Sequence, residues 1–180
     1  MPLYFWNDPD NKKCREAYFD VYPGVWRHGD YIVMHSDTGG ATFCGRSDSV
    51  LKPSGVRIGT SEIYNVVEEL PEVADSVAIG QVWEGDQRVL LFVKLAPGFQ
   101  LTQDLENKIR KSLREKASPR HVPARIIEVP DIPYTMNMKK VESAVTNLVQ
   151  ERPVLNRDAL VNPQSLAYYE KIIGEGVLKY

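Results

Sequence analysis

The chain has 180 residues, with 22 lysine and arginine side chains against 24 aspartate and glutamate side chains, and a formal net charge of −2. This length suits one domain, or one domain with an attached segment, and the balanced charge gives no argument for nucleic acid as a partner. No apolar run approaches the length of a membrane span, and the polar N-terminus is unlike a signal peptide. Two cysteines without metal-ligand spacing predict neither a disulfide framework nor a metal site, so a reducing compartment, by default the cytosol, is expected.

The first 30 residues are rich in aromatic side chains and show little periodicity. Rings at this density need a surface to pack on, and this segment looks insufficient to bury them alone. A strand over residues 31–35, a turn over 36–40 and a returning strand over 41–44 predict a β-hairpin. His35, Ser36 and Asp37 have the letters of a hydrolase triad, but neighbours in a strand and turn cannot converge as a triad must.

Residues 45–63 form a compact segment rich in turn residues. Proline and glycine over residues 53–55 predict a tight hairpin turn. Arg46 and Arg57 stand on short, stiff pieces of chain and present rigid donor forks suited to phosphate or carboxylate. A surface ion pair is the alternative interpretation of Arg46, and a simple turn residue that of Asp48.

The remaining elements alternate between helices and strands. We expect a helix capped by Thr60 or Ser61, a central strand over 73–82, its antiparallel partner over 88–95, a helix opening at Thr102, a strand over 124–128, a helix beginning at Lys139 and a last helix starting at Asn162-Pro163. The pattern predicts an α+β fold with a central three-stranded sheet flanked by helices.

Several motifs carry a resemblance to known enzymes. Gly45-Arg46-Ser47-Asp48, Ser54-Gly55-Val56-Arg57, Glu62-Ile63 and the loop Pro133 to Lys140 resemble the C-terminal domain of the adenylate-forming acyl-CoA synthetases, whose loop reads P-x-T-x-x-G-K. Further motifs are similar to the acetoacetyl-CoA synthetases within that superfamily: Phe5-Trp6-Asn7-Asp8, Tyr22-Pro23-Gly24-Val25-Trp26, His28-Gly29-Asp30-Tyr31, Arg120-His121-Val122-Pro123 and Ile132-Pro133-Tyr134-Thr135. The resemblance runs in order along nearly the whole chain.

The resemblance implies a domain organisation and a reaction. Residues 1–47 are expected to be a remnant of the large N-terminal domain with its β-hairpin, 48–150 the small C-terminal lid domain, and 151–180 a tail with a docking helix. The family reaction joins acetoacetate to CoA with ATP through an acyl-adenylate, and releases AMP and pyrophosphate. The product, acetoacetyl-CoA, serves lipid synthesis, and the Mg²⁺ that accompanies ATP is expected to bind mainly to the larger domain.

The resemblance also assigns roles to residues. Asp30 is expected to accept hydrogen bonds from the ribose hydroxyls of ATP, although taken alone it is also a plausible turn aspartate. Arg46 and Arg57 are expected to contact the nucleotide, and Asp48 to serve as the hinge. Gly55 belongs to the hairpin that the family brings against the pantetheine channel, where glycine permits close backbone approach.

Lys139 is the expected catalytic residue, because a point charge on a loop can stabilise negative charge developing between a carboxylate and the α-phosphate. Without the resemblance, Lys139 and Lys140 would be interpreted as a solvated pair. Met138 replaces the glycine of the family loop, which costs free energy if this position needs positive φ. Glu142 stands where the wider superfamily often has arginine.

A local excess of basic side chains lies between Lys108 and Arg125. Arg110 lies near the place where the family contacts CoA, so it is expected to bind CoA phosphate. A solvated helix face is the alternative interpretation.

The chain has no Gly-rich phosphate loop preceding a helix, and the family's acid pocket lies in the larger domain. We therefore expect this polypeptide alone to be inactive as a ligase. The alternatives are a stand-alone module that binds CoA or nucleotide or docks on a full-length synthetase, and a purely structural domain. Exposed Trp6, Phe19 and Trp26 would favour part of a longer enzyme.

Overall fold

The computed structural model describes residues 3–47, 50–154 and 157–178. The chain divides into two compact units, residues 1–30 and 31–180, which are described separately. The expected boundaries at residues 47 and 150 stay predictions.

The first unit contains α1 (Lys12–Tyr18) and most of the aromatic side chains of the chain's beginning. The ring of Tyr18 stacks on Phe5 at 6.0 Å between centroids and lies 6.3 Å from Trp26. Trp6 nevertheless remains 92% exposed and Trp26 45% exposed, while Phe19 is half-buried. The rings of this unit therefore pack on one another only in part.

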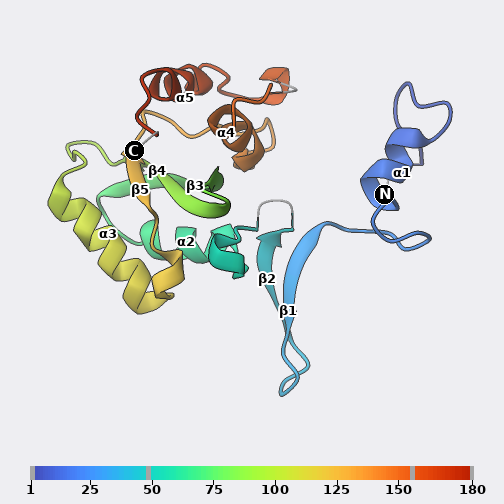
Figure 1. The fold of residues 1–180 in the computed structure, drawn as a ribbon, viewed down its shortest axis with the longest axis horizontal. Coiled ribbons are helices and arrows are strands. Elements are labelled where there is room, and N and C mark those ends of the chain that lie inside the picture. The colour runs from blue at the N-terminus through green and yellow to red at the C-terminus, as the bar shows by residue number, and fades with distance from the viewer. Residues whose placement is uncertain (1–2, 48–49, 155–156, 179–180) are drawn as a thin grey trace. The chain divides into compact units, whose positions relative to one another are not determined.

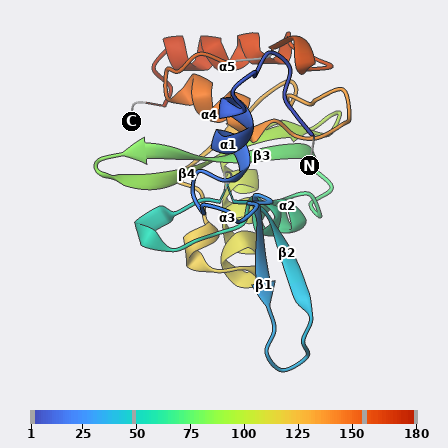
Figure 2. The same ribbon diagram turned by 90° about the vertical axis from the view of Figure 1, so that its right-hand side faces the viewer.

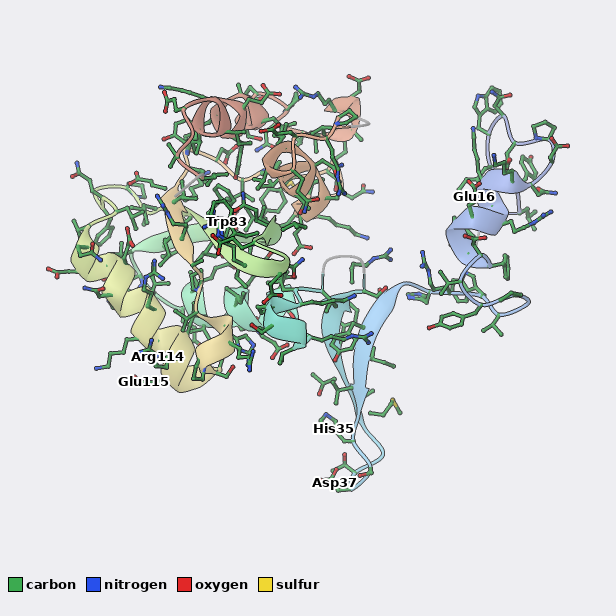
Figure 3. The ribbon with its side chains drawn as sticks, viewed as in Figure 1. Glu16, His35, Asp37, Trp83, Arg114 and Glu115 are labelled. Carbon is green, nitrogen blue, oxygen red and sulfur yellow. The ribbon has the colours of Figure 1, made fainter. Side chains whose placement is uncertain are left out.

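A two-stranded hairpin follows, made of β1 (Asp30–Met34) and β2 (Ala41–Arg46). Figure 3 shows His35 and Asp37 at its tip. The His35 ring nitrogen Nε2 lies 2.7 Å from Thr42 Oγ1 on the opposite strand. The histidine is thus engaged with a side chain across the hairpin.

The main sheet has the order β3-β4-β5. β3 (Val73–Trp83) and β4 (Asp86–Leu95) pair antiparallel, and β5 (Arg125–Glu128) pairs parallel with β4. The predicted α+β fold with a three-stranded sheet is confirmed, but β4 is the central strand, so the assignment of residues 73–82 as central was wrong. The apolar sequence of β3 reflects burial on both faces rather than a central position.

Helices cover both faces of this sheet (Figures 1 and 2). α2 (Thr60–Val67) and α3 (Gln103–Lys116) lie on one face, and α4 (Glu142–Val149) and α5 (Ser165–Gly174) on the other. Successive strand residues point to opposite faces, so Leu90 and Phe92 enter the α4–α5 core while Leu91 enters the α2–α3 core. No helix of the described residues has the length and apolar character of a membrane span.

Of the first two helices of the domain, one starts differently from expectation and one starts as expected. α2 has Gly59 at its N-cap rather than Thr60 or Ser61, and the Glu62 carboxylate accepts from the Gly59 amide at 2.8 Å. Glycine can occupy this N-cap position although it has no side chain, because the Glu62 carboxylate accepts from the Gly59 amide. The helix expected to open at Thr102 is confirmed as α3, and the Thr102 side chain caps it by accepting from the Leu105 amide at 3.3 Å.

The last two helices begin later than expected. α4 starts at Glu142 rather than Lys139, because the preceding residues form a loop. α5 starts at Ser165 rather than Asn162-Pro163. The Asn162 side chain is used elsewhere: its Oδ1 accepts from the Tyr134 amide at 2.9 Å and its Nδ2 donates to the Ile132 carbonyl at 2.8 Å. Asn162 therefore joins the tail to the loop instead of capping a helix.

Candidate functional site

The loop between β5 and α4 is closed by its own hydrogen bonds. The Thr135 amide donates to the Lys139 carbonyl at 2.9 Å, and the Met138 amide donates to the Thr135 carbonyl at 2.8 Å. The Lys139 amide donates to Thr135 Oγ1 at 3.2 Å. Tyr134 and Lys140 pair as an antiparallel bridge across the loop. The loop is thus a tight reversal that presents Lys139 on its return side.

Met138 takes a left-handed backbone conformation, with φ of 55°. The sequence-based suspicion that this position needs positive φ is therefore confirmed. A residue with a Cβ pays about 1–2 kcal/mol for this conformation. The backbone at residue 138 thus has a conformation that suits glycine, although the residue is methionine.

The two adjacent lysines have different surroundings. Lys139 is exposed and makes no ion pair within the described part of the chain. The Lys140 side chain is only 18% exposed, and its Nζ lies 2.8 Å from Asp75 Oδ1, pairs with Glu68 and donates to the Ser76 carbonyl at 2.9 Å. A solvated pair is therefore the wrong description for Lys140.

A hollow of about 540 Å³ opens beside Lys139. Its described lining is Arg46, Thr135, Lys139, Lys140, Val141, Glu142, Ser143, Thr146, Asn147 and Arg152. Besides Lys140, which is paired with Glu68 and Asp75, the lining has three cations, Arg46, Lys139 and Arg152, against the one carboxylate of Glu142. The lining therefore has an excess of positive charge. Such a surface favours an anion such as a phosphate group. The structure thus brings Arg46 and Lys139, which are far apart in sequence, to one hollow.

The one acidic lining residue already has a partner. The Tyr64 hydroxyl donates to Glu142 Oε1 at 2.6 Å. Burial, followed by the nearby Glu142 charge, raises the pKa of Tyr64 well above its usual value. Glu142, which departs from the arginine of the wider superfamily, thus connects α4 to α2.

The segment with Gly55 and Arg57 forms a small hairpin with a 3-10 turn at Pro53–Gly55. Gly55 has φ of 78°, and its backbone faces open space because a Cβ there would meet nothing within 4 Å. Arg57 is exposed and has no ion-pair partner within the described residues. The predicted turn is confirmed, and both residues are accessible to a ligand.

Asp30 closes the first unit at the start of β1. One of its carboxylate oxygens lies 2.5 Å from Nδ1 of His28, and 24% of its side chain is exposed. The carboxylate is therefore held by a neighbour rather than directed freely to solvent. Asp48, the expected hinge, lies outside the described residues.

Arg110 is engaged in contacts within the domain. Its guanidinium donates to the Pro123 carbonyl and, at 3.4 Å, to the Ala124 carbonyl. It also pairs with Glu106 at 3.5 Å on the preceding helical turn. These bonds join α3 to the segment that enters β5, so binding of CoA by Arg110 stays a prediction.

Other cations of the same helix are ion-paired with residues next to α2. Lys108 Nζ lies 2.6 Å from Glu72, and Lys116 Nζ lies 2.5 Å from Glu69. Arg114 lies near the C-terminal end of α3 (Figure 3) and is exposed. These contacts favour an ion-paired helix face for Lys108 and Lys116.

Comparison with known proteins shows what the chain resembles. The AMP-binding enzyme C-terminal domain matches residues 62–139, a span that ends at the candidate catalytic lysine. The chain is 55% identical over 166 residues to the acetoacetyl-coenzyme A synthetase of Rhizobium meliloti (strain 1021), and 48% identical over 173 residues to that of Danio rerio. Its fold matches acetoacetyl-CoA synthetase from Streptomyces lividans with a TM-score of 0.88 and 43% identity. The chain contains an AMP-binding enzyme C-terminal domain and matches the C-terminal part of the acetoacetyl-CoA synthetases.

The match covers nearly all of this chain but a small part of its relatives. The aligned region takes 92%, 96% and 97% of the chain in these three comparisons, against 25%, 26% and 26% of the respective synthetases. The chain thus spans about a quarter of their length and corresponds to the C-terminal part of an acetoacetyl-CoA synthetase. The resemblance inferred from the motifs is confirmed at this level.

Acetoacetyl-CoA synthetases use ATP, which is handled with Mg²⁺. No group of three or more metal-ligating histidine, cysteine, aspartate or glutamate side chains occurs among the described residues. The described side chains therefore do not fit a site that holds a metal ion by protein ligands alone.

Two features of the site were missed by sequence reasoning. Arg152 joins the lining of the hollow from beyond α4, in a segment that looked merely polar and broken by proline. Lys140 pairs with Glu68 and Asp75, residues more than sixty positions earlier. No local pattern signals either contact, because both depend on how distant elements pack.

Proposed function

We propose that the chain acts as the C-terminal lid of an acetoacetate–CoA ligase. The observation that carries this proposal is the exposed Lys139, unpaired by any described residue, beside a hollow that also contains Arg46 and has an excess of positive charge. An ammonium held in this way can interact with an anionic ligand without first breaking an ion pair.

In the first step, a carboxylate oxygen of acetoacetate attacks the α-phosphorus of ATP. The bond from that phosphorus to the bridging oxygen breaks, and pyrophosphate leaves. Lys139 stabilises the negative charge that develops between the carboxylate and the α-phosphate. Arg46 contacts the nucleotide and Asp30 accepts from its ribose hydroxyls.

In the second step, the sulfur of CoA attacks the acyl carbon of the adenylate. AMP leaves, and the thiol proton passes to solvent. Between the steps the domain rotates about Asp48, which brings Gly55 and Arg57 against the nucleotide and the pantetheine channel. Arg110 is proposed to contact CoA phosphate.

The chain alone is proposed to be inactive as a ligase. The 92% exposure of Trp6 and 45% exposure of Trp26 support packing of the first unit against a larger domain. The acid pocket and the main phosphate contacts would come from that domain. The reaction would supply acetoacetyl-CoA for lipid metabolism in the cytosol.

A chimera tests the proposal. The C-terminal quarter of the Rhizobium meliloti synthetase is replaced by this chain, and acetoacetate-dependent ATP–pyrophosphate exchange is measured. Lys139→Ala should lower the exchange about 100-fold or more, because one stabilising charge at the reacting phosphate is lost. Lys171→Ala, an exposed lysine on α5, is the control and should have no effect. An active chimera in which Lys139→Ala matches the control would overturn the proposal.

The alternative is a stand-alone module that binds CoA or nucleotide without catalysis. It is favoured only by the hollow, whose lining lies entirely within the second unit. Titration calorimetry of the chain alone with CoA and with AMP separates the two functions. Binding that is lost on Arg57→Ala and Lys139→Ala supports the module, whereas absence of binding together with an active chimera supports the lid.

A further inference from the structure

We propose that Lys140 is a positioning residue that fixes the direction of Lys139 by clamping the loop to β3. The inference rests on the proposed function, because it concerns the loop that carries the catalytic lysine. It adds a residue whose side chain contacts the domain rather than the substrate.

The first step of the argument is the set of acceptors around Lys140. Its Nζ pairs with Glu68, lies 2.8 Å from Asp75 Oδ1 and donates to the Ser76 carbonyl at 2.9 Å. The same Nζ lies 4.3 Å from the centre of the Tyr64 ring. One partly buried cation thus joins the loop to the end of α2 and to the beginning of β3.

The second step concerns the acceptors themselves. Asp75 also holds the other side of the loop, since the Tyr134 hydroxyl donates to its Oδ2 at 2.8 Å. Glu68 accepts from the Ser76 hydroxyl at 2.7 Å. The single carboxylate of Asp75 therefore contacts both Tyr134 and Lys140, the two residues that pair across the loop.

The third step is the position of Lys139 within this arrangement. Adjacent residues of an extended segment point in opposite directions, so anchoring Lys140 inward directs Lys139 outward. The burial of the two side chains agrees with these directions. The Lys140 side chain is mostly buried, with 18% exposed, whereas Lys139 is exposed to solvent. The contacts of Lys140 thus fix the direction in which the neighbouring Lys139 side chain points.

The fourth step is the consequence of losing the clamp. Without Lys140, the carboxylates of Glu68 and Asp75 would face each other across the same site with no intervening cation. Unpaired, partly buried carboxylates repel and take up water, which would loosen the loop. A catalytic group displaced by about 1 Å can lose on the order of 100-fold in rate.

Amide exchange on the full 180-residue chain tests the clamp without any activity. In Lys140→Met, the amides of Thr135, Met138 and Lys139 should exchange about tenfold or more faster, while amides of β4 keep their protection. Lys108→Met is the control. It removes a lysine of α3 that is paired with Glu72, outside the loop, and should leave the three loop amides unchanged. Unchanged loop amides in Lys140→Met would sink the inference.

Partial reactions of the chimera test the catalytic consequence. Lys140→Met should lower ATP–pyrophosphate exchange about 100-fold through kcat, with KM for ATP unchanged, because Lys140 does not touch substrate. Thioester formation from supplied butyryl-adenylate and CoA should stay within about twofold. Lys140→Arg, which keeps the charge, should restore part of the exchange activity.

The outcomes separate the two proposals. Equal loss of both partial reactions in Lys140→Met means a merely structural role and overturns the inference. Loss in Lys139→Ala without loss in Lys140→Met overturns the inference alone, and loss in neither overturns the proposed function. Tyr134→Phe provides a milder variant that keeps every charge, and it should lower exchange about tenfold by releasing the other side of the clamp.

Discussion

Met138, the residue before the catalytic candidate Lys139, has a strained backbone conformation. Met138 has φ of 55°, and its side chain is 68% exposed, so packing of the side chain does not compensate for the unfavourable backbone conformation. The hydrogen bonds between Thr135 and the residues that follow hold the loop in this conformation. Strain of this kind persists only where surrounding contacts determine the geometry.

Replacing Met138 by glycine should therefore stabilise the chain. We expect Met138→Gly to raise the free energy of unfolding by about 0.5–1 kcal/mol, the relief of the left-handed conformation less the added entropy of the unfolded glycine. Urea unfolding followed by circular dichroism measures this. Met136→Gly is the matched control, because Met136 is 69% exposed in the same loop without positive φ. It should lower stability, and an equal effect of both changes would contradict the explanation.

The same loop shows what sequence can predict at the scale of residues. The catalytic role of Lys139 stays a prediction from the local motif. The need for positive φ at residue 138 follows from the same motif, because it is a property of a few consecutive residues. The inward direction of Lys140 does not, since its partners Glu68 and Asp75 reach it only after β3 has packed beside the loop. Long-range ion pairs of this type leave no periodic signal.

At the scale of elements, the hairpin that carries Gly55 and Arg57 is held by the β3–β4 turn. The Ser54 amide lies 3.1 and 3.0 Å from the two carboxylate oxygens of Asp86, and the Lys52 amide donates to the Gln87 side chain. These bonds fix a turn in which Ser54 has φ of 51°. Asp86 and Gln87, at the start of β4, thus hold the backbone of the hairpin that carries Gly55 and Arg57.

Removing either anchor should release one part of the hairpin. In Asp86→Ala the Ser54 amide should exchange about tenfold faster while the Lys52 amide is unchanged, and Gln87→Ala should give the reverse. Each variant is the control for the other, and exchange measured by nuclear magnetic resonance resolves the two amides. If both amides respond equally to both variants, the turn opens as one unit and the separate anchoring is wrong.

Element boundaries show where sequence reasoning reaches its limit. Apolar periodicity predicted α2, α3 and both long strands because each buries a regular face. Apolar periodicity also placed β3 at the centre of the sheet. A strand covered by helices on both faces has a continuous apolar sequence even at the edge of a sheet, so its sequence looks like that of a central strand. The predicted start of α4 was wrong because the left-handed backbone of Met138 interrupts the segment before it. The predicted start of α5 was wrong because the Asn162 side chain accepts from the Tyr134 amide instead of capping the helix.

At the scale of the whole molecule, one sheet separates two hydrophobic cores, and tyrosine hydroxyls tie the layers together. Tyr64 donates from α2 to Glu142 on α4 at 2.6 Å, and Tyr169 donates from α5 to the Asp131 carbonyl at 3.2 Å. Burial raises the pKa of both phenols, with Glu142 adding to the effect on Tyr64 and Asp131 to that on Tyr169. These links require the protonated hydroxyl.

Stability should therefore fall at alkaline pH. The folded chain keeps the Tyr64 proton after the unfolded chain, with an ordinary phenol pKa of 10.0, has lost it. The unfolded state then binds fewer protons, so this contribution is complete below pH 10 and is lost as pH rises above it, by about 1.4 kcal/mol per pH unit for each phenol. Urea unfolding from pH 8 to pH 11.5 measures the slope.

Tyr64→Phe isolates one of these phenols. The variant loses the bond to Glu142, so it should be less stable than the parent chain at pH 8, but its stability should fall less steeply above pH 10. The difference between the two slopes should approach that of a single proton, because all other titrating groups are common to both chains. Parallel curves would mean that Tyr64 ionises equally in the folded and unfolded chains, and that its hydroxyl does not hold α2 to α4.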